Sequence, residues 1–187
     1  MKAEELNKKV QMLCDIEEIR KLKFDYWWYL DHKQWDKFAD LFTEDMTYTN
    51  IASGEKKTKG PWLQGLYGFL DDNTRSSHHG HQAKIEIIDE CNAKGIWVLR
   101  DELNNLRSNT VFLGRGWYFE TYRKVDGVWK FSSFALDYNM ARGGAVNIYG
   151  ADVRSALGSI GWDLGKQSWD EALKTNMDAL AELGFTF

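Results

Sequence analysis

Apolar side chains in the first thirty residues recur every three or four positions, which is the spacing of one face of an α-helix. The pattern predicts a long amphipathic helix that ends near Asp31. Its apolar stripe consists of Leu6, Val10, Leu13, Ile16, Ile19, Leu22, Tyr26 and Leu30. Two shorter helices are expected at residues 34–42 and 60–70, the second because Pro61 fits a first helical turn, where its missing N–H costs nothing.

Strand patterns dominate the chain from His79 onward. The predicted strands are residues 46–51, 81–88, 95–103, 111–123 and 128–138. Asp126-Gly127 separates the last two and favours a tight antiparallel hairpin, because Gly accepts the positive φ of such a turn. Helices followed by strands predict an α+β domain, with helices packed on one face of a mostly antiparallel sheet.

The chain has 187 residues, of which 43% are hydrophobic, and this fits one compact domain. We expect residues 1–140 to form the functional part. A Gly-rich stretch at 141–165 leads to an amphipathic segment at 169–183. We interpret residues 141–187 as a C-terminal extension of the same domain, which covers a pocket as a lid or contacts another subunit.

Charge and composition narrow the range of partners. The formal net charge is −4, and the sequence has no concentrated run of Lys and Arg, so nucleic acid is not expected as a partner. Neither a membrane-spanning stretch nor the apolar core of a signal peptide is found, so we expect a soluble cytoplasmic protein. Cys14 and Cys91 lie outside any Cys-x-x-Cys spacing, and we expect neither a disulfide nor a zinc site.

Two strand residues are candidates for chemistry. Alternation along residues 81–88 places His81 on the apolar face, where a hydrogen-bonded structural role and a catalytic role are both open. Asp101 shares its predicted face with Trp97, Leu99 and Leu103. A buried carboxylate is costly without a partner, so Asp101 is either paired structurally or kept for function.

The end of the long helix combines phenols, indoles and a carboxylate, at Tyr26, Trp27 and Asp31 among others. On an ideal helix Tyr26 and Asp31 point about 140° apart, so their spacing alone does not direct both into one pocket. Without further information, Asp31 is also a simple turn cap.

The remaining histidines and one strand pair have ordinary interpretations. His32, His78 and His79 lie at a helix end and in a polar loop, where we expect exposure to solvent. Arg115 and Trp117 share a strand face, where Arg115 is suited either to a substrate oxygen or to a structural ion pair.

Taken in order, several segments resemble the SnoaL-like, nuclear-transport-factor-like family. They are residues 15–20, Tyr26, Leu30-Asp31, Trp35-Asp36, Leu41-Phe42, Lys59-Gly60-Pro61, His81, Tyr122 and residues 126–130. Within the family the chain is similar to bile-acid dehydratases and hexachlorocyclohexane dehydrochlorinases, and more distantly to scytalone dehydratases. The resemblance implies a cone-shaped, strongly curved sheet packed against the N-terminal helices, a deep pocket between them, and a homo-oligomer, with a trimer favoured.

The resemblance also implies a catalytic set, formed by an Asp31 and His81 dyad together with Tyr26 and Asp101. We therefore expect a carboxylate oxygen of Asp31 about 2.6 to 3.2 Å from a ring nitrogen of His81. The side chains expected to contact substrate are Trp27, Tyr48, Trp97, Leu99, Arg115 and Trp117.

These expectations describe a cofactor-free lyase without a metal. His81 would be the general base, Asp31 would fix its tautomer, and Tyr26 and Asp101 would bind the oxygen that develops charge. The reaction implied is β-elimination, first of all dehydration or otherwise loss of halide, from a hydrophobic small molecule. The many Trp and Tyr residues favour an aromatic or polycyclic substrate. An isomerase, a cyclase, a retro-aldol lyase and a non-catalytic ligand-binding module remain alternatives, because fold alone does not assign function.

Overall fold

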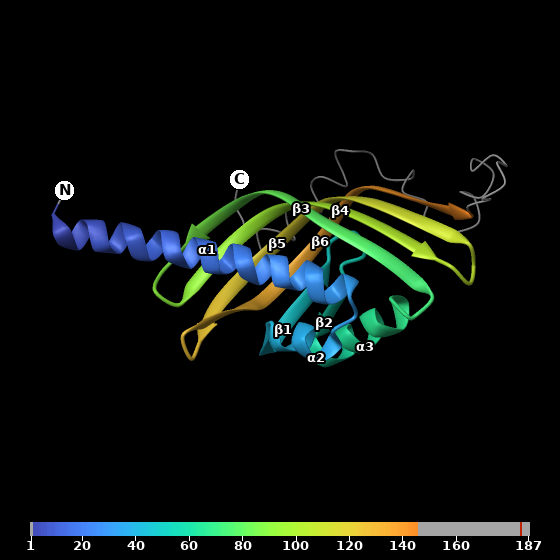
Figure 1. Ribbon diagram of the computed structural model, residues 1–187, viewed down its shortest axis with the longest axis horizontal. Coiled ribbons are helices and arrows are strands. Elements are labelled where there is room, and N and C mark those ends of the chain that lie inside the picture. Colours follow the sequence, from blue (N-terminus) through green and yellow to red (C-terminus); the bar gives the residue numbers. More distant parts are fainter. Residues whose placement is uncertain (1, 146–183, 185–187) are drawn as a thin grey trace.

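Figure 1 shows the computed structural model of the protein, in which residues 2–145 and residue 184 are described. The helices are α1 (Ala3–Asp31), α2 (Trp35–Asp40) and α3 (Lys59–Phe69). The strands are β1 (Phe42–Asn50), β2 (Lys56–Thr58), β3 (Thr74–Ile87), β4 (Asn92–Asn105), β5 (Thr110–Val125) and β6 (Val128–Ala145).

The six strands form one curved sheet in the order β2-β1-β6-β5-β4-β3. Strands β1 and β6 pair in parallel, and every other neighbouring pair is antiparallel. At the predicted hairpin, Asp126 and Gly127 have φ values of 50° and 81°, which joins β5 to β6 by a tight turn. In Figure 1 the sheet curls over α1, while α2 and α3 lie beside β1 and β2. The predicted α+β class and mostly antiparallel sheet are confirmed.

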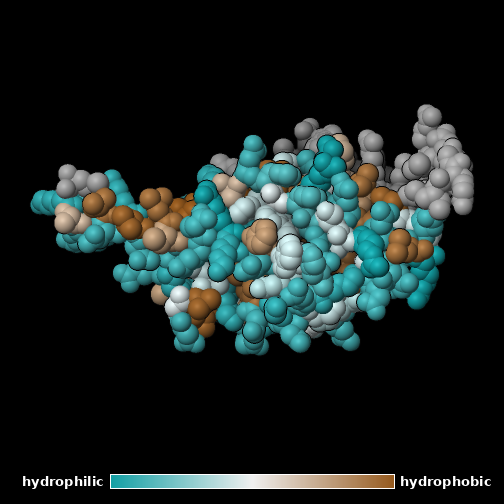
Figure 2. All heavy atoms as spheres, in the orientation of Figure 1, coloured by the Kyte–Doolittle hydropathy of each residue, from teal (hydrophilic) through white to brown (hydrophobic). Residues whose placement is uncertain are grey.

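Helix α1 packs on the sheet from about Asp15 onward, where the Asp15 carboxylate accepts a hydrogen bond from Trp129 of β6. Ile19, Tyr26 and Leu30 are at most 3% exposed, whereas Leu6 and Leu13 are 47% and 61% exposed. The part of the helix before Asp15 extends beyond the sheet, and Figure 2 shows hydrophobic atoms along this projecting part. The predicted stripe therefore covers the core only where sheet lies beneath it.

Several boundaries differ from the sequence prediction, among them those of α2 and β3. Helix α2 ends at Asp40, because Phe42 already pairs with Phe131 in the sheet. Strand β3 begins at Thr74, well before the predicted start at residue 81, and residues 74–80 pair with β4 although their side chains are mostly polar. Short strand β2 was not predicted.

A β-bulge in β3 decides which side chains face the core. His81 pairs with Val98 and Lys84 with Ile96, so two residues of β3 lie opposite Trp97 alone. Gln82 within this bulge has a φ of 41°. One extra residue reverses the alternation of side chains along a strand. His78 therefore shares a face with Ala83 and the residues that alternate after it, and His81 does not.

The main core lies between the concave face of the sheet and the three helices, and it is unusually aromatic. A smaller cluster on the other face is formed by Ile51, Phe119 and Ala135. Strand β6 runs to Ala145, across the predicted boundary at residue 140. The predicted amphipathic segment at 169–183 lies outside the described residues. Among the described helices, none is long and apolar enough to cross a bilayer.

Candidate active site

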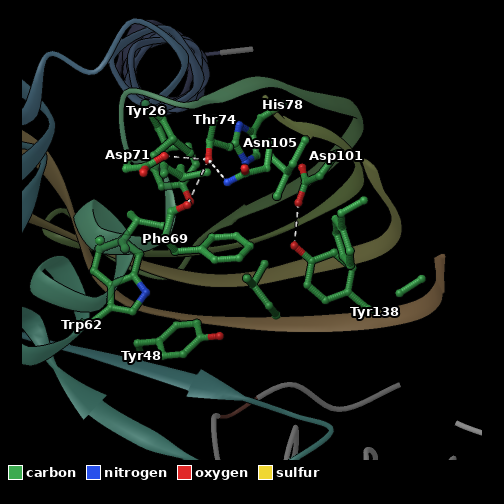
Figure 3. A pocket seen from close by; sticks show the side chains of 18 of the residues that line it. Tyr26, Tyr48, Trp62, Phe69, Asp71, Thr74, His78, Asp101, Asn105 and Tyr138 are labelled. Carbon is green, nitrogen blue, oxygen red and sulfur yellow. Dashed lines mark hydrogen bonds between the residues drawn. The ribbon is translucent and has the colours of Figure 1, made fainter. Parts of the chain in front are cut away.

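A cavity of about 670 Å³ lies between the concave face of the sheet and the helices. Aromatic side chains from α1, β1, α3, β5 and β6 form much of its wall. They include Tyr26, Tyr48, Trp62, Tyr118, Phe134 and Tyr138, and Figure 3 shows several of them around the hollow. The cavity also contains His78 and Asp101, the groups with acid–base chemistry.

The end of α1 is fixed against the start of β3. Lys33 has a φ of 54°, which turns the chain sharply after the helix. Its ammonium donates hydrogen bonds to the backbone oxygens of Leu70, at 2.9 Å, and Thr74, at 2.8 Å. These contacts place Asp31, the last residue of α1, beside β3.

Asp31 forms a two-point contact with His78. The Nδ1 atom of His78 lies 2.6 Å from one carboxylate oxygen, and the backbone N–H of His78 donates to the other at 2.9 Å. The two side chains are only 6% and 18% exposed for His78 and Asp31. An Nδ1–H that donates to Asp31 leaves Nε2 of His78 free to accept a proton.

The charge state of Asp31 suits this role. Burial by itself raises the pKa of Asp31, but the hydrogen bonds and charge of His78 outweigh burial, so the pKa lies below its usual value. Asp31 is therefore a carboxylate at neutral pH, and it can stabilise an imidazolium on His78.

Asp101 lies directly across the sheet from His78, as its partner in the β3–β4 register. It is 2% exposed. One of its oxygens accepts a hydrogen bond from the Tyr138 hydroxyl at 2.6 Å, and the other has no partner among the described residues. Burial raises the pKa of Asp101, and His78, Tyr138 and Lys23 only partly oppose this. When Asp101 is protonated, the oxygen without a partner can donate a hydrogen bond into the cavity.

The phenols of the cavity stay protonated as well. Burial raises the pKa of Tyr48 to about 12 and holds those of Tyr26 and Tyr118 well above the usual value. Their hydroxyls are therefore hydrogen-bond donors at neutral pH. The site thus combines one imidazole, that of His78, which is hydrogen-bonded to the Asp31 carboxylate, with several neutral tyrosine hydroxyls in a mostly apolar cavity.

The predicted pair of Asp31 with His81 is wrong, because His78 occupies that place. His81 lies in a separate hollow on the opposite face of the sheet, together with Arg115 and Trp117. The physical reason is the β3 bulge, which reverses the alternation assumed for residues 81–88. The expectation that His78 lies in an exposed loop is also wrong, for a different reason: β3 begins at Thr74, so His78 lies within a strand.

The predicted substrate contacts divide into three groups. Tyr48 lines the cavity, as expected. Trp27, Trp97 and Leu99 are not among the side chains that line it, and the rings of Trp27 and Trp97 contact edge to face at 5.5 Å. Arg115 and Trp117 lie on the opposite face. Predicted residues Tyr26 and Asp101 both lie at the cavity.

Sequence reasoning missed Tyr118 and Tyr138, which line the cavity from β5 and β6. Tyr138 lies four residues after Phe134 in β6, so alternation along the strand could have placed both side chains on the same face. No sequence signal marks the bulge that brings His78 inward. Among the described residues, no group of three or more His, Cys, Asp and Glu is arranged to hold a metal ion.

A helix-covered, curved sheet around an apolar cavity with a buried Asp–His pair defines a small-molecule-binding scaffold. The model of the SnoaL-like domain family matches residues 11–135. The chain therefore belongs to the SnoaL-like family.

Solved structures agree with this assignment. A scytalone dehydratase-like protein from Novosphingobium aromaticivorans is 26% identical, with a TM-score of 0.68 over 77% of this chain and 99% of that one. The hexachlorocyclohexane dehydrochlorinase LinA type 2 is 21% identical, with a TM-score of 0.64 over 74% of this chain and 95% of that one. The LinA-type3 dehydrochlorinase from Novosphingobium barchaimii is 22% identical, with a TM-score of 0.64 over 74% and 96%. Relatives on this scaffold thus include dehydratase-like and dehydrochlorinase proteins.

Proposed function

We propose that the protein is a cofactor-independent lyase that eliminates a leaving group, first of all water, from an uncharged hydrophobic small molecule. The observation that carries this proposal is the Asp31–His78 pair at an aromatic cavity, with Asp101 directly across the sheet from His78. Similarity to dehydratase-like and dehydrochlorinase proteins supports the same reaction class.

In the proposed reaction, Nε2 of His78 removes a proton from a carbon next to an activating group. The electron pair of that C–H bond forms the new double bond, and the bond to the leaving group breaks. Asp31 stabilises the imidazolium that forms on His78. Protonated Asp101 gives a proton or a hydrogen bond to the departing oxygen, and Tyr26 supports an oxygen that develops charge. Return of the proton from His78 to Asp101 completes the cycle, and the scheme requires no metal or organic cofactor.

The wall of the cavity favours an uncharged substrate. Among the described residues, the carboxyl groups of Asp71 and Asp101 line it, and neither Lys nor Arg does. An anionic ligand would lose its hydration without gaining a direct ion pair with a lining residue there. The aromatic wall suits a flat or multi-ring compound.

An isomerase is the second candidate, because the same base and donors can move a proton without a leaving group. The observation that favours it is the Tyr138–Asp101 hydrogen bond, which fixes the Asp101 carboxyl so that its other oxygen, when protonated, can donate to a carbonyl-derived oxygen throughout a proton transfer. A cyclase or a retro-aldol lyase would need the same base. A homotrimer is proposed from the family resemblance, and light scattering after size exclusion measures it.

Exchange of His78 for Gln tests the base. The probe is nitrobenzisoxazole, a neutral aromatic compound in which loss of a C–H proton breaks the N–O bond and releases a phenolate. We expect His78→Gln to lower its turnover about 10² to 10⁴-fold, with binding of the probe altered only modestly, because Gln keeps hydrogen bonding but is no base.

His81→Gln is the matched control, since it makes the same change three residues away on the opposite face of β3. It should leave turnover unchanged. Equal rates for the wild type and His78→Gln would contradict the proposal. Probe binding without any turnover by the wild type would favour a binding module.

A further inference from the structure

Lys23 is a completely buried cation that the proposed reaction does not use. Its side chain, from α1, and that of Glu120, from β5, are both 0% exposed. The two form a direct ion pair. Burial lowers the pKa of Lys23, while the neighbouring charge and hydrogen bond of Glu120 raise it. Removing both ions from water is costly, and apolar replacements of such a pair are often as stable, so stability alone is a weak explanation for it.

The ammonium of Lys23 lies against the wall of the cavity. Its Nζ atom is 3.4 Å from the ring centre of Tyr118 and 4.2 Å from that of Tyr26. Both tyrosines line the cavity. A positive charge therefore lies immediately behind two phenols that face the reaction space.

Apart from Lys23, the hydrogen-bond partners of Glu120 lie away from the cavity. Its second oxygen accepts a hydrogen bond from the Tyr122 hydroxyl, and that hydroxyl accepts one from Nε1 of Trp97 at 2.8 Å. Neither Tyr122 nor Trp97 lines the cavity. Lys23 is thus the partner that lies next to the cavity-lining phenols. Glu120 is hydrogen-bonded to a side chain that does not line the cavity.

We propose that Lys23 is a positioning residue that stabilises negative charge on an oxygen in the cavity, acting through the rings of Tyr26 and Tyr118. This rests on the proposed function, in which such charge develops on a leaving or enolate oxygen. A cation on the face of a phenol makes its hydroxyl a stronger donor, and a fixed charge acts strongly where water is excluded. Glu120 holds the ammonium in position through their direct ion pair.

The double substitution Lys23→Met with Glu120→Gln tests this charge. It removes both charges together, retains nearly the same volume and leaves neither partner as an unpaired ion, so folding should be retained. The matched control is Lys94→Met with Glu86→Gln, which makes the same exchange in a more exposed pair at 3.4 Å. Urea unfolding of both variants verifies that stability is comparable to the wild type.

The readout is the ionisation of bound para-nitrophenol, whose phenol and phenolate forms absorb at different wavelengths. We expect its apparent pKa in the cavity to be about half a unit to one unit higher in the Lys23→Met/Glu120→Gln variant, a roughly three- to tenfold loss of phenolate, and unchanged in the control. A role confined to anchoring α1 would not move this value.

Equal apparent pKa values in the wild type and the double variant would overturn the proposal, as would failure of the wild type to bind para-nitrophenol. This measurement needs no turnover, so its failure is distinct from failure of the proposed lyase activity. The latter is decided by His78→Gln.

Discussion

The two faces of β3 carry histidines with different surroundings. His78 is tied to the Asp31 carboxylate and lies at the aromatic cavity, whereas His81 lies in a hollow on the far face beside Arg115. The rings of His79 and His81 are parallel at 6.3 Å. The two imidazoles thus differ in the groups around them, and in the proposed mechanism only His78 serves as the base.

Among the substitutions that test this difference between His78 and His81, Asp31→Asn is expected to have the largest effect on turnover. It removes the charge that supports a protonated His78, and we expect a loss of nitrobenzisoxazole turnover on the order of 10²-fold or more. Asp72→Asn, a change of an exposed carboxyl in the loop before β3, is the matched control and should be silent. If the Asp31 variant keeps the wild-type rate, the two histidines do not differ through this carboxylate.

A smaller effect is expected from Asp101→Asn, which keeps the shape and a donor but cannot transfer a proton. We expect turnover to fall about tenfold, as for weakening of one donor to a developing charge. An undiminished rate would remove Asp101 from the proposed mechanism.

The same variant has a defined pH signature. Because burial raises the pKa of Asp101, its protonated form favours folding below the ordinary value of 3.8, and this contribution is lost as the pH rises through the raised pKa. The wild type should therefore lose stability relative to Asp101→Asn as the pH rises through that window. Urea unfolding at several pH values measures this difference, and parallel curves for the two proteins would contradict a raised pKa.

A third prediction concerns Gly80, which shares the inner face of β3 with His78. A methyl group at this position would overlap the ring of Trp27. Gly80→Ala should therefore cost about 1 to 3 kcal/mol in the free energy of unfolding, measured with urea. Gly68→Ala, where nothing lies within 4 Å of the added carbon, is the control. Equal free energies of unfolding for the two variants would contradict this prediction, because the Trp27 ring would then have moved away from the added methyl group without cost.

The smallest effect is expected from Arg115→Ala on the opposite face. The turnover of nitrobenzisoxazole should stay within about twofold of wild type, as for surface substitutions away from the site. A loss comparable with that of Asp101→Asn would mean that the two faces are coupled.

Much of the fold follows from the pattern of the chain. The long helix ending at Asp31, the hairpin at Asp126-Gly127 and the face shared by Trp97 and Asp101 were all predicted, because each depends on local periodicity or turn chemistry. The early start of β3 was not, because its polar side chains carry no strand signal and are held by pairing with β4.

The pattern of the sequence determined the α+β class, and its family resemblance pointed to four members of the candidate site, Tyr26, Asp31, Tyr48 and Asp101. Only the tertiary structure decided which histidine joins them. Asp31 and His78 are 47 positions apart and meet because the end of α1 is fixed beside β3. The bulge opposite Trp97 then turns His78 inward and His81 outward. A period of two extends only as far as a strand stays regular, so one inserted residue reverses every inference drawn across it.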